Sequence, residues 1–167
     1  QMEIDSAVKF KLGFPMGIFE LADFTGLDVI HKATVEMHTR DKKVILPHSS
    51  IEQLFNEKKL GQKSGEGFYK YSDDKYERIP LSEESAQKCD PTQIIANILN
   101  NAAWLVTNHA SDIDEIEKAA SLGLGLKKPL FDTAKEIGIE KIVEELKELS
   151  KKYGAFYEPD PLLLSMC

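Results

Sequence analysis

The sequence of 167 residues has few cysteines and no long apolar run. Its two cysteines, Cys89 and Cys167, lie far apart and cannot form the disulfide framework of a small secreted domain. We therefore expect a reducing, cytoplasmic setting. No stretch approaches the roughly 18 apolar residues that span a bilayer, and the N-terminus lacks the pattern of a signal peptide. We accordingly expect no membrane partner.

Basic residues are also in the minority, with 21 Lys and Arg against 28 Asp and Glu and a formal net charge of −7. Nucleic-acid binding needs a basic surface that neutralises phosphates, so we expect no nucleic-acid partner. Arginine occurs only at Arg40 and Arg78, and lysines alternate with glutamates, a composition enriched in thermophile proteins. The length and the 42% hydrophobic content suit one globular domain or two small ones.

The short motifs of common catalytic and metal sites are absent as well. The sequence contains no nucleophile elbow, no P-loop, no dinucleotide-binding glycine motif and no spacing typical of metal ligands. His31 and His38 can share a helix face, but surface or helix-end histidines are far commoner than ligands. We expect no catalytic, cofactor or metal site built from such motifs.

Helical periodicity, separated by glycine, dominates what remains. Gly13 and Gly26 each follow a periodic segment, Pro15 prevents the first helix from continuing, and Asp90-Pro91 is typical of a helix start. The pattern therefore predicts an all-α fold. The predicted helices cover residues 4–12, 18–26, 28–40, 49–59 and 92–109.

Polar side chains on these helices allow two interpretations each. The asparagines of the last helix either line a polar site or tie down neighbouring loops, and loop ties are the commoner role. Glu20, Asp23 and Asp28 can be a catalytic acid and base, but their places near helix starts favour capping. The asparagines are Asn97, Asn100, Asn101 and Asn108.

The sequence also repeats itself. Residues 13–28 align without gaps on residues 125–140, with identical residues at four positions. The same offset pairs Ile4 with Ile116 and Pro47 with Pro159. We predict two copies of one helical unit, residues 1–71 and 90–167, joined by a linker at 72–89. The first copy lacks its first helix and the second its end, so we expect an excerpt of a longer protein.

The most specific local feature is the turn Gly-Phe-Pro-Met-Gly at residues 13–17 and the helix that follows it. Aromatic and methionine side chains here suit an adaptable apolar pocket, although packing of the turn onto the core is the commoner role of such residues. The candidate pocket residues are Phe14, Met16, Phe19 and Leu21.

Two motifs carry a resemblance to a known family. Residues 13–28 begin Gly-Phe-Pro-Met-Gly, and residues 57–71 end Gly-Glu-Gly-Phe-Tyr-Lys-Tyr. Both resemble the C-terminal helical domain of 3-hydroxyacyl-CoA dehydrogenases, and the tandem arrangement resembles members in which that domain is duplicated. Asn100 resembles the asparagine of an Asn-Glu-Ala motif in the later copy, and we interpret it as structural.

The resemblance implies a helical fold like the C-terminal domain of 6-phosphogluconate dehydrogenase, with the two copies packed as an intramolecular pseudo-dimer. It implies an NAD-dependent enzyme that interconverts 3-hydroxyacyl-CoA and 3-oxoacyl-CoA in fatty-acid metabolism and β-oxidation. NAD and the catalytic residues would belong to a Rossmann domain absent from this chain, so the fragment alone is expected to be inactive. A fused enoyl-CoA hydratase is a further partner that the resemblance allows.

In the family the turn faces the acyl chain, so the resemblance makes its side chains candidate walls of the acyl pocket. Ile18 departs from the family's usual proline, and the second copy has Lys127, Lys128 and Pro129 in place of Pro-Met-Gly. We therefore expect substrate contact only in the first copy. The alternative is a non-catalytic helical assembly module, in which Phe14 and Met16 pack against the second copy.

Overall fold

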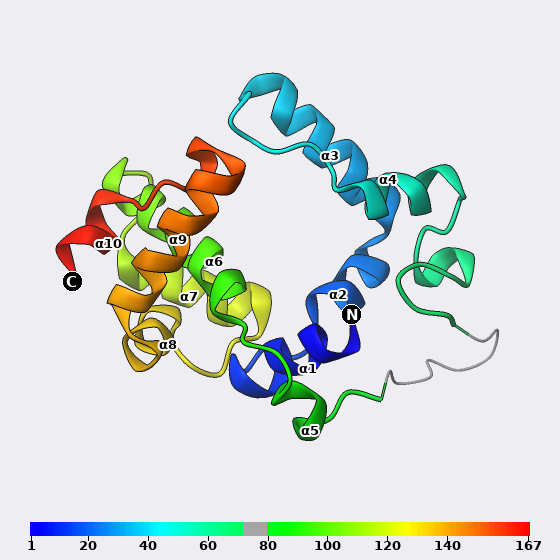
Figure 1. Ribbon diagram of the computed structural model, residues 1–167, viewed down its shortest axis with the longest axis horizontal. Helices are drawn as coiled ribbons and strands as arrows, with labels where there is room; N and C mark the ends of the chain where they lie inside the picture. Colours follow the sequence, from blue (N-terminus) through cyan, green and yellow to red (C-terminus); the bar gives the residue numbers. More distant parts are fainter. Residues whose placement is uncertain (72–79) are drawn as a thin grey trace.

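Glycine and proline divide the chain into short helices. The computed structural model describes residues 1–71 and 80–167, and their regular elements are helical apart from isolated bridges of Glu66 with Gly61 and with Lys70 (Figure 1). The prediction of an all-α fold is confirmed. The elements are α1 (Met2–Lys11), α2 (Ile18–Thr25), α3 (Leu27–Arg40), α4 (Ser49–Asn56), η1 (Gln62–Ser64), α5 (Glu83–Ala86), α6 (Thr92–Thr107), α7 (Ile113–Leu124), α8 (Leu130–Ile137), α9 (Ile139–Tyr153), η2 (Ala155–Tyr157) and α10 (Pro161–Ser165).

The five helices predicted from periodicity all form. Helices α1, α2, α3 and α6 begin and end within about two residues of the prediction, the usual uncertainty of helix ends. Helix α4 ends at Asn56, earlier than predicted. Lys58 adopts a left-handed φ of 61°, which an α-helix cannot contain, and this stops the helix.

The structure follows the repeat of the sequence. The offset that aligns residues 13–28 with residues 125–140 also places the first residues of α2, α3 and α4 on those of α8, α9 and α10. Gly26 separates α2 from α3 with a φ of 98°, and Gly138 separates α8 from α9 with a φ of 101°. These backbone angles favour glycine, which explains why glycine occupies both positions. The chain therefore folds the same order of helices twice.

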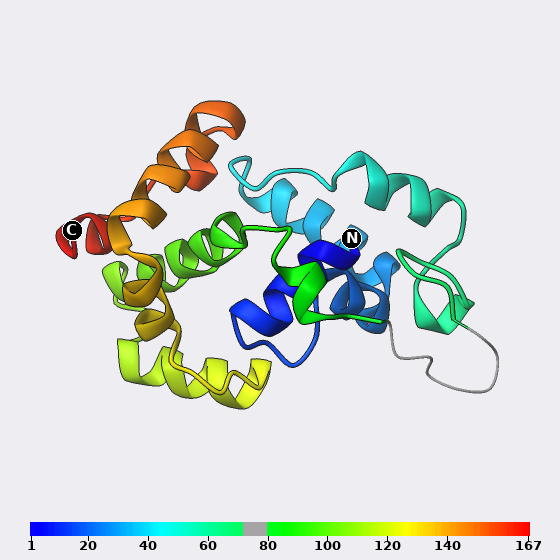
Figure 2. The same ribbon diagram turned by 60° about the horizontal axis from the view of Figure 1, so that its bottom comes forward.

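Helix α6 forms the centre of the second copy. It packs against α7, α8, α9 and α10, and Figure 2 shows it surrounded by these elements. Its buried face includes Ile95, Leu99 and Ala103, each at most 1% exposed. Asn100 donates to the Glu158 carbonyl at 2.8 Å and accepts from the Asp160 N–H at 2.8 Å. It ties down the segment before α10, which confirms the structural interpretation of this asparagine.

The two copies share one hydrophobic core. Val8 and Leu12 of α1 belong to the same buried cluster as Ile95 of α6 and Leu130 of α8, and Phe14 packs against that cluster. Burial of these side chains in one core gives the two units a common source of stability. Figure 1 shows α1 between α2–α4 on one side and α6–α10 on the other.

The segment between the copies contributes a short helix of its own. Residues 72–79 of the predicted linker lie outside the described residues. In residues 80–89, α5 packs on α1, Ala86 is 1% exposed, and the Ser82 N–H donates to the Ser6 hydroxyl at 3.3 Å. This end of the predicted linker is therefore attached to the first copy. Ser82 also caps α5, because its side chain accepts from the Ser85 N–H.

Candidate functional site

The turn between α1 and α2 is built by its two glycines. Gly13 has a left-handed φ of 75° directly after α1, where such a residue ends a helix. Gly17 is the N-cap of α2, and its N–H donates to Glu20 Oε2 at 3.2 Å. The three residues between the glycines are therefore presented at a fixed angle between two helices.

The carboxylate of Asp5, on α1, caps the start of α2. It is fully buried and accepts hydrogen bonds from the N–H groups of Phe19 and Glu20, both at 2.9 Å. A Cβ added at Gly17 would lie 2.1 Å from Asp5 Cγ. Glycine is therefore required here, because any side chain would displace the carboxylate from the helix end.

The second copy makes the same cap with different residues. Glu117, the counterpart of Asp5 in the repeat, accepts from the N–H groups of Leu130 and Phe131 at 2.6 and 2.7 Å. Pro129 stands where the first copy has its glycine. The longer glutamate reaches the helix start past the bulkier proline, so aspartate with glycine and glutamate with proline are equivalent solutions to one capping problem.

Burial favours the protonated form of the Asp5 side chain. Burial raises the pKa of the Asp5 carboxyl, against hydrogen bonds from Phe19, from the Tyr69 hydroxyl at 2.9 Å and from Glu20. Burial and the Asp5 charge raise the pKa of Tyr69, so its hydroxyl stays a donor. The raised pKa of Asp5 favours folding at low pH, and this contribution is lost as pH rises from 3.8 through the folded pKa.

A second buried carboxylate holds the segment that follows η1. Asp23, 1% exposed, accepts from the N–H groups of Phe68 and Tyr69 and from the Tyr71 hydroxyl, each at 2.9 Å. A Cβ added at Gly67 would lie 2.2 Å from Asp23 Oδ1. We call residues 61–71 the arm. Asp23 thus fixes the arm on α2.

The predicted capping carboxylates have three different roles. Glu20 forms the capping box of α2, as predicted. Asp28 lies in the first turn of α3, as predicted, and its ion pair with Lys63 holds its pKa below the usual range. The capping prediction is wrong for Asp23, which binds the arm. Its partners lie 45 to 48 residues along the chain, beyond any local pattern.

The four candidate pocket residues lie in different surroundings. Phe14 is half-buried against the shared core, Met16 is half-buried, and Leu21 is 40% exposed. Phe19 meets Phe68 of the arm edge-to-face, with ring centroids 4.7 Å apart. Sequence reasoning missed Phe68, although it lies in the second motif. Phe19 and Leu21 lie on α2, and together with Phe68 they form the part of the candidate pocket that this helix carries.

The turn also approaches its counterpart in the second copy. A Cβ added at Gly125 would lie 3.4 Å from Pro15 Cγ, so the two equivalent turns are in van der Waals range. Phe14 and Ile18 pack against the core that includes the second copy. This part of the turn serves the contact between copies, as the alternative of an assembly module expects for Phe14.

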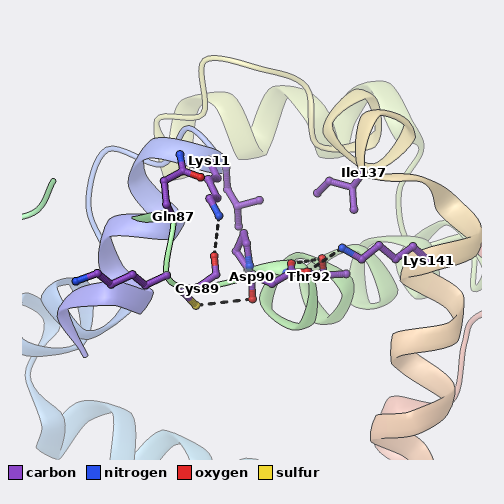
Figure 3. Close-up of a pocket in the computed structure, with 10 residues that line it drawn as sticks. Lys11, Gln87, Cys89, Asp90, Thr92, Ile137 and Lys141 are labelled. Atoms are coloured by element: carbon purple, nitrogen blue, oxygen red, sulfur yellow. Dashed lines mark hydrogen bonds and ion pairs between the residues drawn. The ribbon is translucent and has the colours of Figure 1, made fainter. Parts of the chain in front are cut away.

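A cavity of about 390 Å³ lies where α1, the segment before α6, and α8–α9 meet (Figure 3). Lys11 Nζ donates to the Cys89 carbonyl at 2.9 Å, and Lys141 Nζ lies 2.8 Å from Asp90 Oδ2. A second cavity of about 270 Å³ lies beside α9 and is lined by Tyr153. Neither cavity is lined by the candidate pocket residues.

Replacing Asp90 with Asn is expected to lower the free energy of unfolding at neutral pH and to change it little at pH 2. Lys141 and Thr92 hold the pKa of Asp90 down, to about 2 from 3.8. A lowered folded pKa contributes stability above pH 3.8 that is lost as pH falls to about 2. The pair is largely exposed, so the contribution is at most about 1 kcal/mol. Urea unfolding at pH 7 and pH 2 should show a difference between wild type and Asp90→Asn that shrinks at pH 2.

Lys141→Met is the matched control for that experiment. It removes the largest cause of the lowered pKa but leaves the Thr92 N–H bond to Asp90 Oδ1 at 2.9 Å. We expect it to abolish most of the pH dependence while retaining this hydrogen bond at the start of α6. An Asp90→Asn variant with the same pH profile as wild type would contradict the assignment.

The other histidine and asparagine candidates have partners within the protein. Asn101 Nδ2 donates to the Asn97 carbonyl at 2.9 Å, and Asn108 Nδ2 donates to the Trp104 carbonyl at 2.8 Å. His31 Nε2 lies 3.0 Å from Glu52 Oε2, and its ring stacks on Phe55 with centroids 4.1 Å apart. His38 Nδ1 lies 2.5 Å from the Val44 carbonyl. Within residues 1–71 and 80–167, no group of three His, Cys, Asp or Glu side chains is arranged to hold a metal ion.

The described residues do not fit a dinucleotide. A Rossmann cradle needs a strand, a glycine-rich turn and a helix start that meets the pyrophosphate, and the described part of the chain has no strand longer than an isolated bridge. The same residues contain no helix with the length and apolarity to span a bilayer. The described residues therefore do not supply the cradle that a dinucleotide needs.

Comparison with known proteins decides the family. The model of the 3-hydroxyacyl-CoA dehydrogenase C-terminal domain matches residues 1–71 and again residues 92–167. The chain belongs to this family. The resemblance carried by the turn and the arm is thus confirmed, and so is its relation to an enzyme family.

Relatives and solved structures agree with this family. The mitochondrial hydroxyacyl-coenzyme A dehydrogenases of Rattus norvegicus and Homo sapiens are both 45% identical over 71 residues, which are 41% of this chain and 23% of each relative. The 3-hydroxybutyryl-CoA dehydrogenase of Escherichia coli K12 matches 99% of this chain with a TM-score of 0.77 at 18% identity. The dehydrogenase part of multifunctional enzyme 1 from Caenorhabditis elegans matches 99% with a TM-score of 0.64 at 20% identity.

This family member covers only part of each relative. It spans about a quarter of the curated dehydrogenases and 54% and 41% of the two solved chains. Because the two solved structures are only 18% and 20% identical to this chain, their likeness concerns the fold. Their coverage of almost the whole chain shows that the tandem arrangement of helices is shared.

Proposed function

We propose that this chain is the substrate-facing and dimer-mimicking helical part of an NAD-dependent 3-hydroxyacyl-CoA dehydrogenase in fatty-acid metabolism. The observation that carries the proposal is the difference between the copies. Residues 1–71 keep the Pro-Met-Gly turn and the arm, whereas residues 125–129 replace that turn with Lys127, Lys128 and Pro129. The 45% identity to the rat dehydrogenase extends over 71 residues, the same length as the first copy.

In the proposal the first copy supplies an apolar wall for the acyl chain, and NAD binds to a part of the enzyme outside these residues. Met16, Phe19 and Leu21 would contact the acyl chain, with Phe68 of the arm supporting Phe19. Bound NAD would accept the hydride, and the role of this chain is to orient the substrate and exclude water. The chain alone is then inactive.

Further parts of the proposal follow from the packing and the composition. The second copy would replace the partner subunit of a dimeric relative, since it shares a core with the first copy. A cytoplasmic compartment is proposed because Cys89 and Cys167 are both free. A fused enoyl-CoA hydratase is proposed as a neighbour because one similar structure is the dehydrogenase part of a multifunctional enzyme from Caenorhabditis elegans.

A chimera tests the proposal. Residues 1–71 replace the matched segment of the rat dehydrogenase, and oxidation of 3-hydroxyacyl-CoA is followed through NADH formation. We expect kcat/KM within about tenfold of the parent, which is about 1.4 kcal/mol. In that chimera, Leu21→Ala should lower kcat/KM for a long acyl chain about fivefold relative to the four-carbon substrate, because about one buried methylene contact is lost.

Val35→Ala is the matched control, because Val35 is an exposed apolar residue on α3. It should leave the preference for acyl-chain length unchanged. A folded chimera without activity would contradict the substrate-facing role. That result would favour the second candidate, a non-catalytic assembly module, which the close approach of Pro15 to the turn at Gly125 supports. NADH-dependent reduction of acetoacetyl-CoA by the chain alone would contradict the expected inactivity.

A further inference from the structure

The larger cavity is positively charged, although the chain as a whole is acidic. Three lysines and one aspartate line it, a surplus of two positive charges in a chain with a formal net charge of −7. These residues are Lys11, Lys88, Lys141 and Asp90. Charge of one sign gathered around a hollow raises the local concentration of ions of the other sign. The cavity therefore favours an anionic occupant.

The charge of the lysines is only partly compensated within the protein. Lys141 pairs with Asp90, and the Asp90 carboxylate also accepts from the Thr92 N–H at 2.9 Å and from the Thr92 hydroxyl. Lys11 and Lys88 form no ion pair with a carboxylate in the described part of the chain. Two lysine charges are thus left for an anion that enters the cavity.

Contacts with the cavity wall hold two of the ammonium groups in place. Lys11 Nζ donates to the Cys89 carbonyl at 2.9 Å, which uses one of its three N–H groups and leaves two for a ligand. In Figure 3, Lys11 lies on one side of the cavity and Lys141 on the other, with Asp90 and Thr92 between them. Because these charges are already in position, an anion needs to order few side chains when it binds.

The cavity also has an apolar part. Leu12, Pro91 and Ile137 line it beside the charged groups. Its volume of about 390 Å³ lies within the range of small-molecule sites, roughly 300–1,000 Å³. A bare ion would leave the apolar surface in contact with water, whereas an ion with an apolar body would cover it. The lining therefore favours an organic anion.

The lining residues come from both copies and from the segment between them. Lys11 belongs to α1 of the first copy, Lys88 to the predicted linker, and Ile137 and Lys141 to α8 and α9 of the second copy. Ligand sites occur preferentially where folding units meet. An occupant of this cavity would contact both copies at once.

We infer that the cavity binds a small organic phosphate monoester, with its phosphate held by Lys11 and Lys141 and its apolar body against Leu12 and Ile137. A phosphate monoester carries a charge of about −1.5 to −2 at neutral pH, which matches the surplus of two positive charges, whereas a carboxylate carries one charge. Lysine binds phosphate as a compact point charge. The inference does not depend on the proposed reaction, because no candidate acyl-wall residue lines this cavity.

The probe is 1-naphthyl phosphate, titrated into the full chain and followed by isothermal titration calorimetry. We expect saturable binding with a Kd of about 1 mM or below. Added NaCl should weaken it, because salt screens exposed charges. Inorganic phosphate lacks the apolar body and should bind at least about fivefold more weakly. The monoanion 1-naphthoate should bind at least about threefold more weakly, because it carries less charge.

Two variants of the charged residues should shift the affinity in opposite directions. Lys11→Met keeps an apolar stem and removes the charge, so it should weaken binding of the probe at least about tenfold. Asp90→Asn removes the negative charge from the lining and frees Lys141, so it should tighten binding about threefold. A variant that merely loosened the fold would not tighten binding. Both residues are exposed, so the variants should fold, as circular dichroism would verify.

Two further variants test the position of the site. Lys147→Met removes the same charge from α9, the helix of Lys141, but Lys147 is exposed and does not line the cavity. Its Kd should differ from that of the wild type by less than about twofold. Ile137→Ala should weaken binding of 1-naphthyl phosphate about threefold, because apolar contact is lost, and leave that of inorganic phosphate unchanged.

Several outcomes would overturn the inference. These are the absence of saturation up to about 10 mM probe, a Kd unchanged by Lys11→Met, or equal weakening by Lys147→Met. Equal affinity for inorganic phosphate would assign the cavity to the free ion instead. Coenzyme A also carries a phosphate monoester, and tighter binding of coenzyme A that Lys11→Met abolishes would assign the cavity to the substrate of the proposed reaction instead. Saturable binding with the expected ranking of probes and variants supports the inference.

Discussion

Replacing Asp23 with Ala is expected to release the arm from α2 and to lower the free energy of unfolding by about 3 kcal/mol. The change leaves two backbone N–H groups, of Phe68 and Tyr69, and the Tyr71 hydroxyl without the carboxylate that accepts from all three. Each lost bond to a charged acceptor contributes about 1.5 kcal/mol or more, and water entering the loosened arm recovers part of this.

The measurement combines global and local stability. Urea unfolding gives the loss in free energy, and hydrogen exchange should show the Phe68 and Tyr69 amides exchanging faster than those of α6. Asp132→Ala is the matched control, because Asp132 has the same side chain on the equivalent helix α8 but is 55% exposed. Its expected effect is within about 0.5 kcal/mol.

The result also bears on the proposed acyl wall. Phe68 belongs to the arm and packs edge-to-face on Phe19. If Asp23→Ala frees the arm, Phe19 loses this support, and in the chimera with the rat dehydrogenase the preference for long acyl chains should weaken together with stability. An Asp23→Ala variant with wild-type stability and protected arm amides would contradict the role assigned to this carboxylate.

The fold was predictable where its causes are local. Gly13 and Gly26 were predictable at helix ends because the local backbone there needs a positive φ, which favours glycine. Apolar periodicity identified α3 and α6. The repeat was visible because the glycine that separates α2 from α3, Gly26, recurs as Gly138 between α8 and α9. Helix α5 was not visible, since four residues carry no periodicity and its stability comes from packing on α1.

The site was less predictable because its contacts are distant in sequence. Asp5 reaches Phe19 N across a turn, and Asp23 reaches the arm 45 residues away. A signal was nevertheless present: Glu117 falls at the position of Asp5 in the repeat, so an acid recurs on the helix that precedes each α2-type helix. Which way Phe14 faces depends on the second copy, and no local pattern contains that information.

Gly61 provides the second large effect, since Gly61→Ala is expected to destabilise the protein by about 3–5 kcal/mol. Gly61 has φ 92° and ψ −151°, a region that residues with side chains rarely occupy, which costs about 1–3 kcal/mol. An added Cβ would also lie 2.2 Å from the backbone oxygen of Asp23. Because that neighbour is backbone, the arm must move away from α2 to relieve the clash.

Substitutions at two other glycines distinguish the cost of backbone strain from the cost of a steric clash. Gly13→Ala meets open space at a φ of 75°, so only backbone strain remains, and we expect a loss of about 1 kcal/mol. Gly123→Ala, inside α7 and also in open space, should stabilise the protein by about 0.5–1 kcal/mol through helix propensity. Urea unfolding of the three variants tests this order. Equal losses of stability for Gly13→Ala and Gly61→Ala would show that the arm can move away from Asp23 without a loss of free energy. Close packing of Gly61 on Asp23 would then not contribute to stability.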